Sequence, residues 1–337
     1  MVHTYYHNEP FQLEAGGVLP EMQIVYHTWG ELNEAKDNVI WICHALTANS
    51  DVEDWWPGMI SERHFINPKK YFIVCANILS SCYGSTSPMS INPATGKKYF
   101  RDFPLVTVRD VAREHDTLRA YLGIDKIYLM LGGSVGGMQA MEYGIMFPDR
   151  VENLMLSATS SSQTAWACAF DESQRMAIKT DPTFYDDVET GGLEGMKVAR
   201  SIALLSYRNS HTYNDTQPND IEKMEEQRSC SYQRYQGEKL AKRYDAYSYY
   251  AITRFVDSHN VGRGRGSVAN ALQMIKAKTL CVGVSTDILY PPEEQRLLAQ
   301  FIPNATYDEV GSPYGHDGFL IEVQKINAVL EKHLGTN

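Results

Sequence analysis

Short apolar runs recur along the chain, separated by longer stretches that have helical periodicity. These runs predict β-strands at residues 22–28, 38–44, 71–76, 127–131, 151–157, 279–284 and 305–310. The first run (MQIVYHT) predicts an antiparallel strand. Runs such as VIWIC and YFIVC are apolar at nearly every position, which is typical of strands buried on both faces of a parallel sheet.

The segments between these runs predict helices. Residues 107–122 place Val108, Val111, Leu118 and Leu122 on one side of a helix. A second helix is expected from residue 135 to 147, before Pro148, and a last helix over 317–334. Strands that alternate with helices indicate an α/β fold with a mostly parallel sheet flanked by helices.

Residues 163–272 interrupt this alternation. The segment is long, mostly compatible with helix, and rich in Tyr, Arg, Asp and Glu. Strands resume after it, which favours an insertion over a separate domain. We therefore expect a core domain of residues 1–162 and 273–337, with a helical cap at 163–272.

Composition narrows the class of protein. The 337 residues are 43% hydrophobic, enough for one large core, and the net charge of −10 argues against nucleic acid or an anionic membrane as partner. No apolar stretch approaches the roughly 18 residues of a membrane span. The first residues lack the pattern of a signal peptide, and the six cysteines show no zinc-type spacing. These features predict a cytoplasmic enzyme without a structural metal.

A Gly-x-Ser-x-Gly motif, Gly132–Gly136, directly follows the apolar run at 127–131. A sharp turn between a strand and a helix would lift the Ser134 hydroxyl out of the sheet. There the backbone N–H of Val135 would face a developing oxyanion. A serine hydroxyl is a weak nucleophile without a base, so this pattern needs a histidine and an acid later in the chain.

Both partners follow in the expected order. Asp287 comes after the strand at 279–284, and His316 lies in a glycine-containing loop after the strand at 305–310. We predict Ser134 as nucleophile, His316 as general base and then acid, and Asp287 as the group that orients the imidazole. A surface-turn role for Asp287 and a solvated-loop role for His316 are the alternatives.

A second oxyanion donor is expected in the loop that follows the VIWIC strand. We assign it to the backbone N–H of Leu46. His44 precedes this amide, and we interpret it as a residue that packs the loop, not as a second base.

Longer motifs resemble the homoserine O-acetyltransferase family of α/β-hydrolase-fold acyltransferases over nearly the whole chain. The segments that carry the resemblance are CHALT (43–47), YFIVCAN (71–77), CYGST (82–86), SINP (90–93), DFP (102–104), TVRD (107–110), GGSVGGMQ (132–139), YR (207–208), YQG (235–237), YDAYS (244–248) and GHDGFL (315–320). SINP and GHDGFL are far more specific than the serine motif.

The resemblance implies an activity and further residues. It implies ping-pong transfer of an acetyl group from acetyl-CoA, as co-substrate, to L-homoserine in methionine biosynthesis, with no bound cofactor. The triad of the family maps onto Ser134, Asp287 and His316. Its homoserine-binding arginine and aspartate map onto Arg208 and Asp317, although Asp317 also suits the N-cap of the last helix. Family members are commonly dimers through the cap, and the tyrosines between residues 232 and 250 suit either such an interface or packing within the cap.

Two departures from the family pattern leave alternatives open. Val135 stands where methionine is usual, and Thr47–Ser50 replaces a glycine-containing loop beside the acyl pocket. A succinyl donor, a serine acceptor, or a simple esterase with the same triad are therefore alternatives. A catalytically inactive binding protein is disfavoured by the complete set of triad residues.

Overall fold

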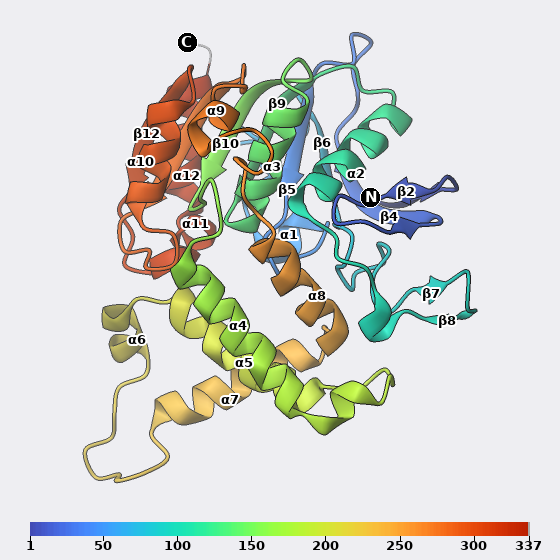
Figure 1. Ribbon diagram of the computed structural model, residues 1–337. Helices are drawn as coiled ribbons and strands as arrows, with labels where there is room; N and C mark the ends of the chain where they lie inside the picture. Colours follow the sequence, from blue (N-terminus) through green and yellow to red (C-terminus); the bar gives the residue numbers. More distant parts are fainter. Residues whose placement is uncertain (336–337) are drawn as a thin grey trace.

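A mostly parallel β-sheet forms the centre of the molecule (Figure 1). The computed structural model describes residues 1–335, and within this range the central sheet has eight strands in the order β1-β4-β6-β5-β9-β10-β11-β12. Their bounds are β1 Val2–His7, β4 Met22–Trp29, β5 Val39–Cys43, β6 Phe72–Ala76, β9 Ile127–Gly133, β10 Val151–Ser157, β11 Lys278–Val284 and β12 Ala305–Val310. In this sheet β5, β6, β9, β10, β11 and β12 are parallel to one another, whereas β1 and β4 are antiparallel to their neighbours. The predicted α/β class is confirmed.

The first strand was not expected from the sequence. β1 alternates exposed and half-buried residues, so it contains no apolar run. It is held at the sheet edge by pairing with β4. The small hairpins β2–β3 (Phe11–Gln12 and Val18–Leu19) and β7–β8 (Ile91–Asn92 and Lys97–Lys98) were missed for the same reason.

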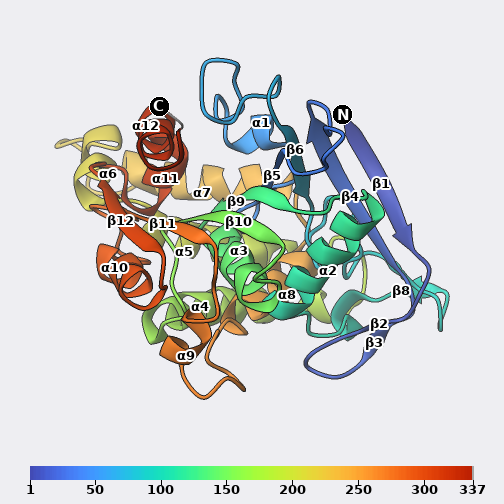
Figure 2. The same ribbon diagram turned by 90° about the horizontal axis from the view of Figure 1, so that it is seen from above.

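Apolar side chains pack on both faces of this sheet. Along β5, Trp41 and Cys43 point into one core and Ile40 and Ile42 into the other, because successive strand residues face opposite sides. Figure 2 shows the helices that cover each face. One face carries α2 (Val108–Tyr121), α3 (Val135–Met146) and α10 (Pro292–Phe301), and the other carries α1 (Val52–Trp55), α11 (Gly318–Ile321) and α12 (Val323–Leu334).

The segment between β10 and β11 is helical, as predicted. Its helices are α4 (Ala165–Thr180), α5 (Leu193–Tyr207), α6 (Ser210–Thr216), α7 (Arg228–Ala241), α8 (Ala246–Asp257) and α9 (Val268–Leu272). In Figure 1, α4, α5 and α7 lie together below the sheet, whereas α9 lies beside α10. Within residues 1–335, no helix is both long enough and apolar enough to cross a membrane.

Three of the tyrosines in this segment are buried inside it. Tyr244, Tyr247 and Tyr249 are buried in a core that α4, α5, α7 and α8 share, and Tyr247 stacks on Phe184. Tyr235 is exposed on α7. Internal packing therefore accounts for the buried tyrosines, and dimerisation through these helices stays a prediction.

The last helix is not continuous, contrary to the prediction of one helix over 317–334. A 3₁₀ turn (Gly315–Asp317) and the short α11 precede α12, and Glu322 breaks the helix between them with ψ of 44°. The indole N–H of Trp56 donates to the carbonyl of Phe319 at 3.1 Å. This carbonyl would otherwise accept from the N–H of Val323, so the contact across the core favours the break.

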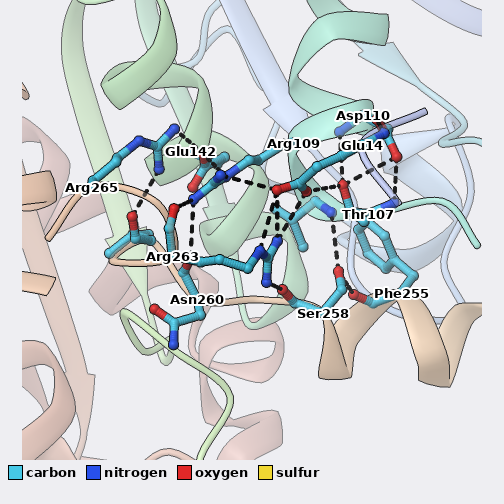
Figure 3. Close-up of polar contacts among 12 residues, drawn as sticks. Glu14, Thr107, Arg109, Asp110, Glu142, Phe255, Ser258, Asn260, Arg263 and Arg265 are labelled. Atoms are coloured by element: carbon cyan, nitrogen blue, oxygen red, sulfur yellow. Dashed lines mark hydrogen bonds and ion pairs between the residues drawn. The ribbon is translucent and has the colours of Figure 1, made fainter. Parts of the chain in front are cut away.

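An ion-pair network joins the N-terminal segment to the loop after α8 (Figure 3). Glu14 accepts hydrogen bonds from Arg109 at 3.0 Å and from Arg263 at 2.9 Å. Glu142 on α3 is only 1% exposed and pairs with Arg109 at 3.1 Å and Arg265 at 2.5 Å. The network therefore ties the end of the inserted segment to the helix that begins at Ser134.

We expect Glu142→Gln to lower the free energy of unfolding by about 3 kcal/mol, because it leaves the guanidinium groups of Arg109 and Arg265 without their buried carboxylate. Urea denaturation at neutral pH measures this change. Asp149→Asn is the control, since Asp149 and Lys276 form an exposed pair that should contribute less than about 1 kcal/mol. Equal losses in the two variants would contradict the assignment.

Candidate active site

Ser134 occupies a strained turn between β9 and α3. Its backbone has φ of 56° and ψ of −124°, a conformation that residues with a side chain rarely adopt. The N–H of Ser134 donates to the carbonyl of Ser157 at 2.9 Å, and its own carbonyl accepts from the Thr159 hydroxyl at 2.8 Å. These bonds, from the end of β10 and the residues that follow it, hold the turn and direct the hydroxyl away from the sheet.

His316 and Asp287 complete a hydrogen-bonded chain with this hydroxyl. The Nε2 atom of His316 lies 2.9 Å from Ser134 Oγ, and Nδ1 lies 2.7 Å from Asp287 Oδ2. The other carboxylate oxygen of Asp287 accepts from the N–H groups of Leu289 and Tyr290 at 2.8 and 3.0 Å. The structure thus brings together three residues whose sequence positions span 182 residues, in the geometry that a serine nucleophile and its base require.

The surroundings of His316 determine the pKa of its imidazole. Burial disfavours the charged imidazolium, but the negative charge of Asp287 and its hydrogen bond outweigh burial, so the pKa of His316 is raised above its ordinary value. Asp287 therefore stabilises the imidazolium that forms when Ser134 loses its proton.

The loop after β5 places a backbone amide beside the serine. Leu46 borders the pocket in front of Ser134 and a small cavity behind it, and Val135 borders that cavity. The N–H of Val135 is the first of α3, so no carbonyl within the helix is available to it. Leu46 and Val135 thus border one cavity together with Ser134, as the two amides of an oxyanion hole must.

His44 is bonded on both ring nitrogens and is not a second base. Its Nε2 accepts the N–H of Ile78 at 3.1 Å, and its Nδ1–H donates to the carbonyl of Ala45 at 2.8 Å. Burial lowers the pKa of His44 to about 4, so the ring is neutral. This agrees with the predicted role in packing the loop.

A pocket of about 390 Å³ opens at the triad and lies between the sheet and the inserted helices. From the sheet side it is lined by Leu46, Ser134, His316 and Asp317. Helix α5 contributes Arg200 and Tyr207, and α7 contributes Lys239. The inserted helices thus cover the nucleophile and add cations to the pocket of an acidic chain.

Arg208 and Asp317, predicted to bind substrate, form an ion pair with each other. Arg208 Nη1 lies 2.7 Å from Asp317 Oδ2. Asp317 lines the pocket, but Arg208 lines a separate cavity with Tyr213. Asp317 makes no capping hydrogen bond at the start of α11, so its suggested capping role is wrong. Burial raises the pKa of Asp317, although Arg208 and His316 partly offset this effect.

Arg200 is a pocket residue that sequence reasoning missed. Its guanidinium carbon lies 5.7 Å from the ring centre of Tyr207, whose ring centre is 5.8 Å from that of His316. Within residues 1–335, Arg200 forms no hydrogen bond or ion pair to another side chain. The seven-residue spacing from Tyr207 places both side chains on one helical face, but only the packing of α5 shows that this face meets the site.

A covered serine nucleophile with its histidine and aspartate, at the carboxyl ends of a mostly parallel sheet, defines an enzyme of the α/β-hydrolase class. The family model described as alpha/beta hydrolase fold matches residues 38–323. The chain is 45% identical to the homoserine O-acetyltransferase of Cyclobacterium marinum, over 97% of this chain and 93% of that protein. The chain belongs to the homoserine O-acetyltransferase family.

Solved structures share this fold. Homoserine O-acetyltransferase from Bacillus anthracis matches with a TM-score of 0.93 at 24% identity, over 100% of this chain and 98% of that one. The L374D mutant of esterase E22 matches with a TM-score of 0.92 at 24% identity, over the full length of both chains. A transferase and an esterase thus match the fold equally well, and only the side chains of the pocket can separate the two activities.

We expect Asp287→Asn to shift the acid limb of the pH profile of kcat/KM to lower pH. His316 must be neutral to act as base, so activity falls as pH falls through its pKa, which Asp287 raises. Without that charge, burial lowers the pKa, and kcat should also fall by about 10³–10⁴-fold.

Hydrolysis of p-nitrophenyl acetate over a range of pH measures both changes. Asp308→Asn is the control, since Asp308 is a half-buried carboxylate that pairs with Lys332 and does not line the pocket, and it should leave the profile unchanged. An unshifted acid limb in Asp287→Asn would show that Asp287 does not set the protonation of His316.

Proposed function

We propose that this chain transfers an acetyl group from acetyl-CoA to the hydroxyl of L-homoserine through an acyl intermediate on Ser134. The observation that carries the proposal is the hydrogen-bonded chain that runs from Asp287 through His316 to Ser134. Ser134 faces a covered pocket that also contains the Asp317 carboxylate and the Arg200 guanidinium. Membership of the homoserine O-acetyltransferase family supports the same substrates.

In the first half-reaction, His316 Nε2 takes the proton of Ser134 as Oγ attacks the thioester carbonyl. The negative charge that forms on the carbonyl oxygen is stabilised by the N–H groups of Leu46 and Val135. The C–S bond then breaks, and the CoA thiolate leaves with the proton from His316. The acetyl ester of Ser134 remains.

In the second half-reaction, homoserine enters the place that CoA has left. Asp317 pairs with its ammonium group, and Arg200 forms charge-assisted hydrogen bonds with its carboxylate. Arg208 holds the Asp317 carboxylate in position, at 2.7 Å. His316 takes the proton of the homoserine hydroxyl, which attacks the ester, and returns it to Ser134 as O-acetylhomoserine is released.

The small cavity behind Ser134 favours an acetyl group. Its volume is about 20 Å³, room for a group of about the size of one water molecule. Phe170 and Leu289 border it, together with the buried carboxyl of Asp171. A succinyl group would bring its free carboxylate next to the Asp171 carboxyl. Burial there disfavours negative charge, as the pKa of Asp171, raised well above its ordinary value, indicates.

Exposed cations at the pocket mouth suit the phosphates of CoA. Lys239 and Arg243 both line the pocket and lie towards its solvent side. Arg243 also donates to the carbonyl of Thr47 at 2.7 Å, which ties it to the loop that precedes α1. They provide the local positive charge that a phosphate-bearing donor needs on a chain of net charge −10.

CoA release tests the proposed function. We expect rapid release from acetyl-CoA with L-homoserine, and release slower by about tenfold or more with succinyl-CoA, with L-serine, or with water as the only acceptor. Ser134→Ala should release no CoA above background while retaining its fold by circular dichroism. Fast release with water alone would indicate a hydrolase, and release by Ser134→Ala would exclude the acyl-serine mechanism.

Replacement of Arg200 tests how the acceptor is bound. We expect Arg200→Gln to raise the KM for homoserine by about 10–100-fold, since it removes a charge-assisted hydrogen bond, and to leave acyl-enzyme formation nearly unchanged. With 3-aminopropan-1-ol, which lacks the carboxylate, the variant and the wild type should differ little.

Lys242→Gln, which removes an exposed cation that does not line the pocket, is the matched control, and Arg200→Lys should recover part of the loss. An equal effect of Arg200→Gln on both acceptors would refute the contact with the carboxylate.

A further inference from the structure

A cluster of buried polar side chains lies beneath the loop that carries Leu46. His44, Glu114, His115 and Gln139 are all 0% exposed, and none belongs to the triad. They come from the end of β5, from α2 and from α3. Burial of polar side chains costs free energy unless hydrogen bonds to the surrounding protein offset the loss of water.

Two of these side chains hold consecutive peptide groups of the loop. The Nε2 atom of Gln139 donates to the carbonyl of His44 at 3.1 Å. The Nδ1–H of His44 donates to the carbonyl of Ala45 at 2.8 Å. That second carbonyl belongs to the same planar peptide group as the N–H of Leu46, and the two point in opposite directions. The bond from His44 therefore sets the direction of the Leu46 N–H.

His115 and the backbone N–H of Ile78 fix the orientation of these two donors. The Oε1 atom of Gln139 lies 3.1 Å from His115 Nε2, which directs the amide nitrogen of Gln139 towards His44. The Nε2 atom of His44 accepts the N–H of Ile78 at 3.1 Å, which leaves Nδ1 as its donor. The His44 ring and the Gln139 amide thus each have one orientation that makes both of their hydrogen bonds.

Helix α3 and the loop also touch directly. A Cβ atom at Gly136 would lie 2.2 Å from the carbonyl oxygen of Cys43, so only glycine permits this approach. Gln139 is one helical turn after Val135, which places both on the same face of α3. Helix α3 therefore both presents the Val135 N–H at its start and contacts the loop that presents the Leu46 N–H.

We propose that Gln139 and His44 are positioning residues that hold the Leu46 N–H in line with that of Val135, so that both reach the oxyanion of the acyl group. This rests on the proposed acylation of Ser134 but not on the identity of the acceptor. Neither side chain contacts the substrate, and each acts through the backbone of residues 44–46.

The test compares p-nitrophenyl acetate with p-nitrophenyl thionoacetate. Sulfur accepts hydrogen bonds weakly, so the thionoester gains little from an oxyanion hole. We expect Gln139→Leu and His44→Leu to slow acylation by the oxygen ester by about 10–100-fold, with KM little changed, and to slow the thionoester much less. The ratio of the two rates should therefore fall.

Conservative and distant variants separate positioning from stability. In His44→Asn, the amide nitrogen can replace Nδ1 as donor to Ala45, and we expect the ratio to stay near the wild-type value. Asn327→Leu removes a buried amide of α12 that donates to the carbonyl of Val323 at 3.0 Å, and should lower stability without changing the ratio.

An unchanged ratio in Gln139→Leu and His44→Leu, with either full activity or an equal loss on both esters, would overturn the proposal. Because both esters report on Ser134 alone, the test remains valid if the chain proves inactive with homoserine. In that case the proposed acceptor fails and the positioning role is judged separately.

Discussion

The strained turn at Ser134 is the constraint on which the site depends. A residue with a side chain at φ of 56° costs about 1–3 kcal/mol. Hydrogen bonds to Ser157 at the end of β10 and to Thr159 just after it offset part of this cost, and they are available because β9 and β10 are parallel and in register. The same turn starts α3, which presents the Val135 N–H and carries Gln139 one turn later. Nucleophile, oxyanion donor and loop support therefore follow from one local geometry.

Charge inside the pocket differs in sign from charge on the whole chain. The chain has a net charge of −10, yet the pocket gathers Arg200, Lys239 and Arg243 from the inserted helices. Asp317 is held by Arg208, and Arg208 is thereby removed from direct contact with the pocket. This division of roles leaves a carboxylate and an arginine that can receive the ammonium and carboxylate of an amino acid. It also explains how a fold shared with an esterase can accommodate a charged acceptor.

Much of the fold and the order of the triad residues were predicted correctly from local patterns. Seven strands lie close to the predicted positions, since continuous apolar runs are typical of strands buried on both faces. The spacing of Ser134, Asp287 and His316 after strand ends predicted that they would meet, because the carboxyl ends of parallel strands lie at one edge of the sheet. β1 and the break at Glu322 were missed, since edge pairing and the bond from Trp56 to Phe319 come from distant parts of the chain.

The sequence by itself determined the periodicity of the elements, the strained glycine-flanked turn and the chemical types of the triad. These features depend on residues only a few positions apart, so they can be inferred from the sequence directly. Only the tertiary structure decided which arginine enters the pocket, because Arg200 and Arg208 lie on one short segment and differ in the direction they face. It also decided that Gln139 and His44 hold the Leu46 amide. The hydrogen bond from Gln139 to the carbonyl of His44 joins residues 95 positions apart, and no local pattern encodes a contact of that range.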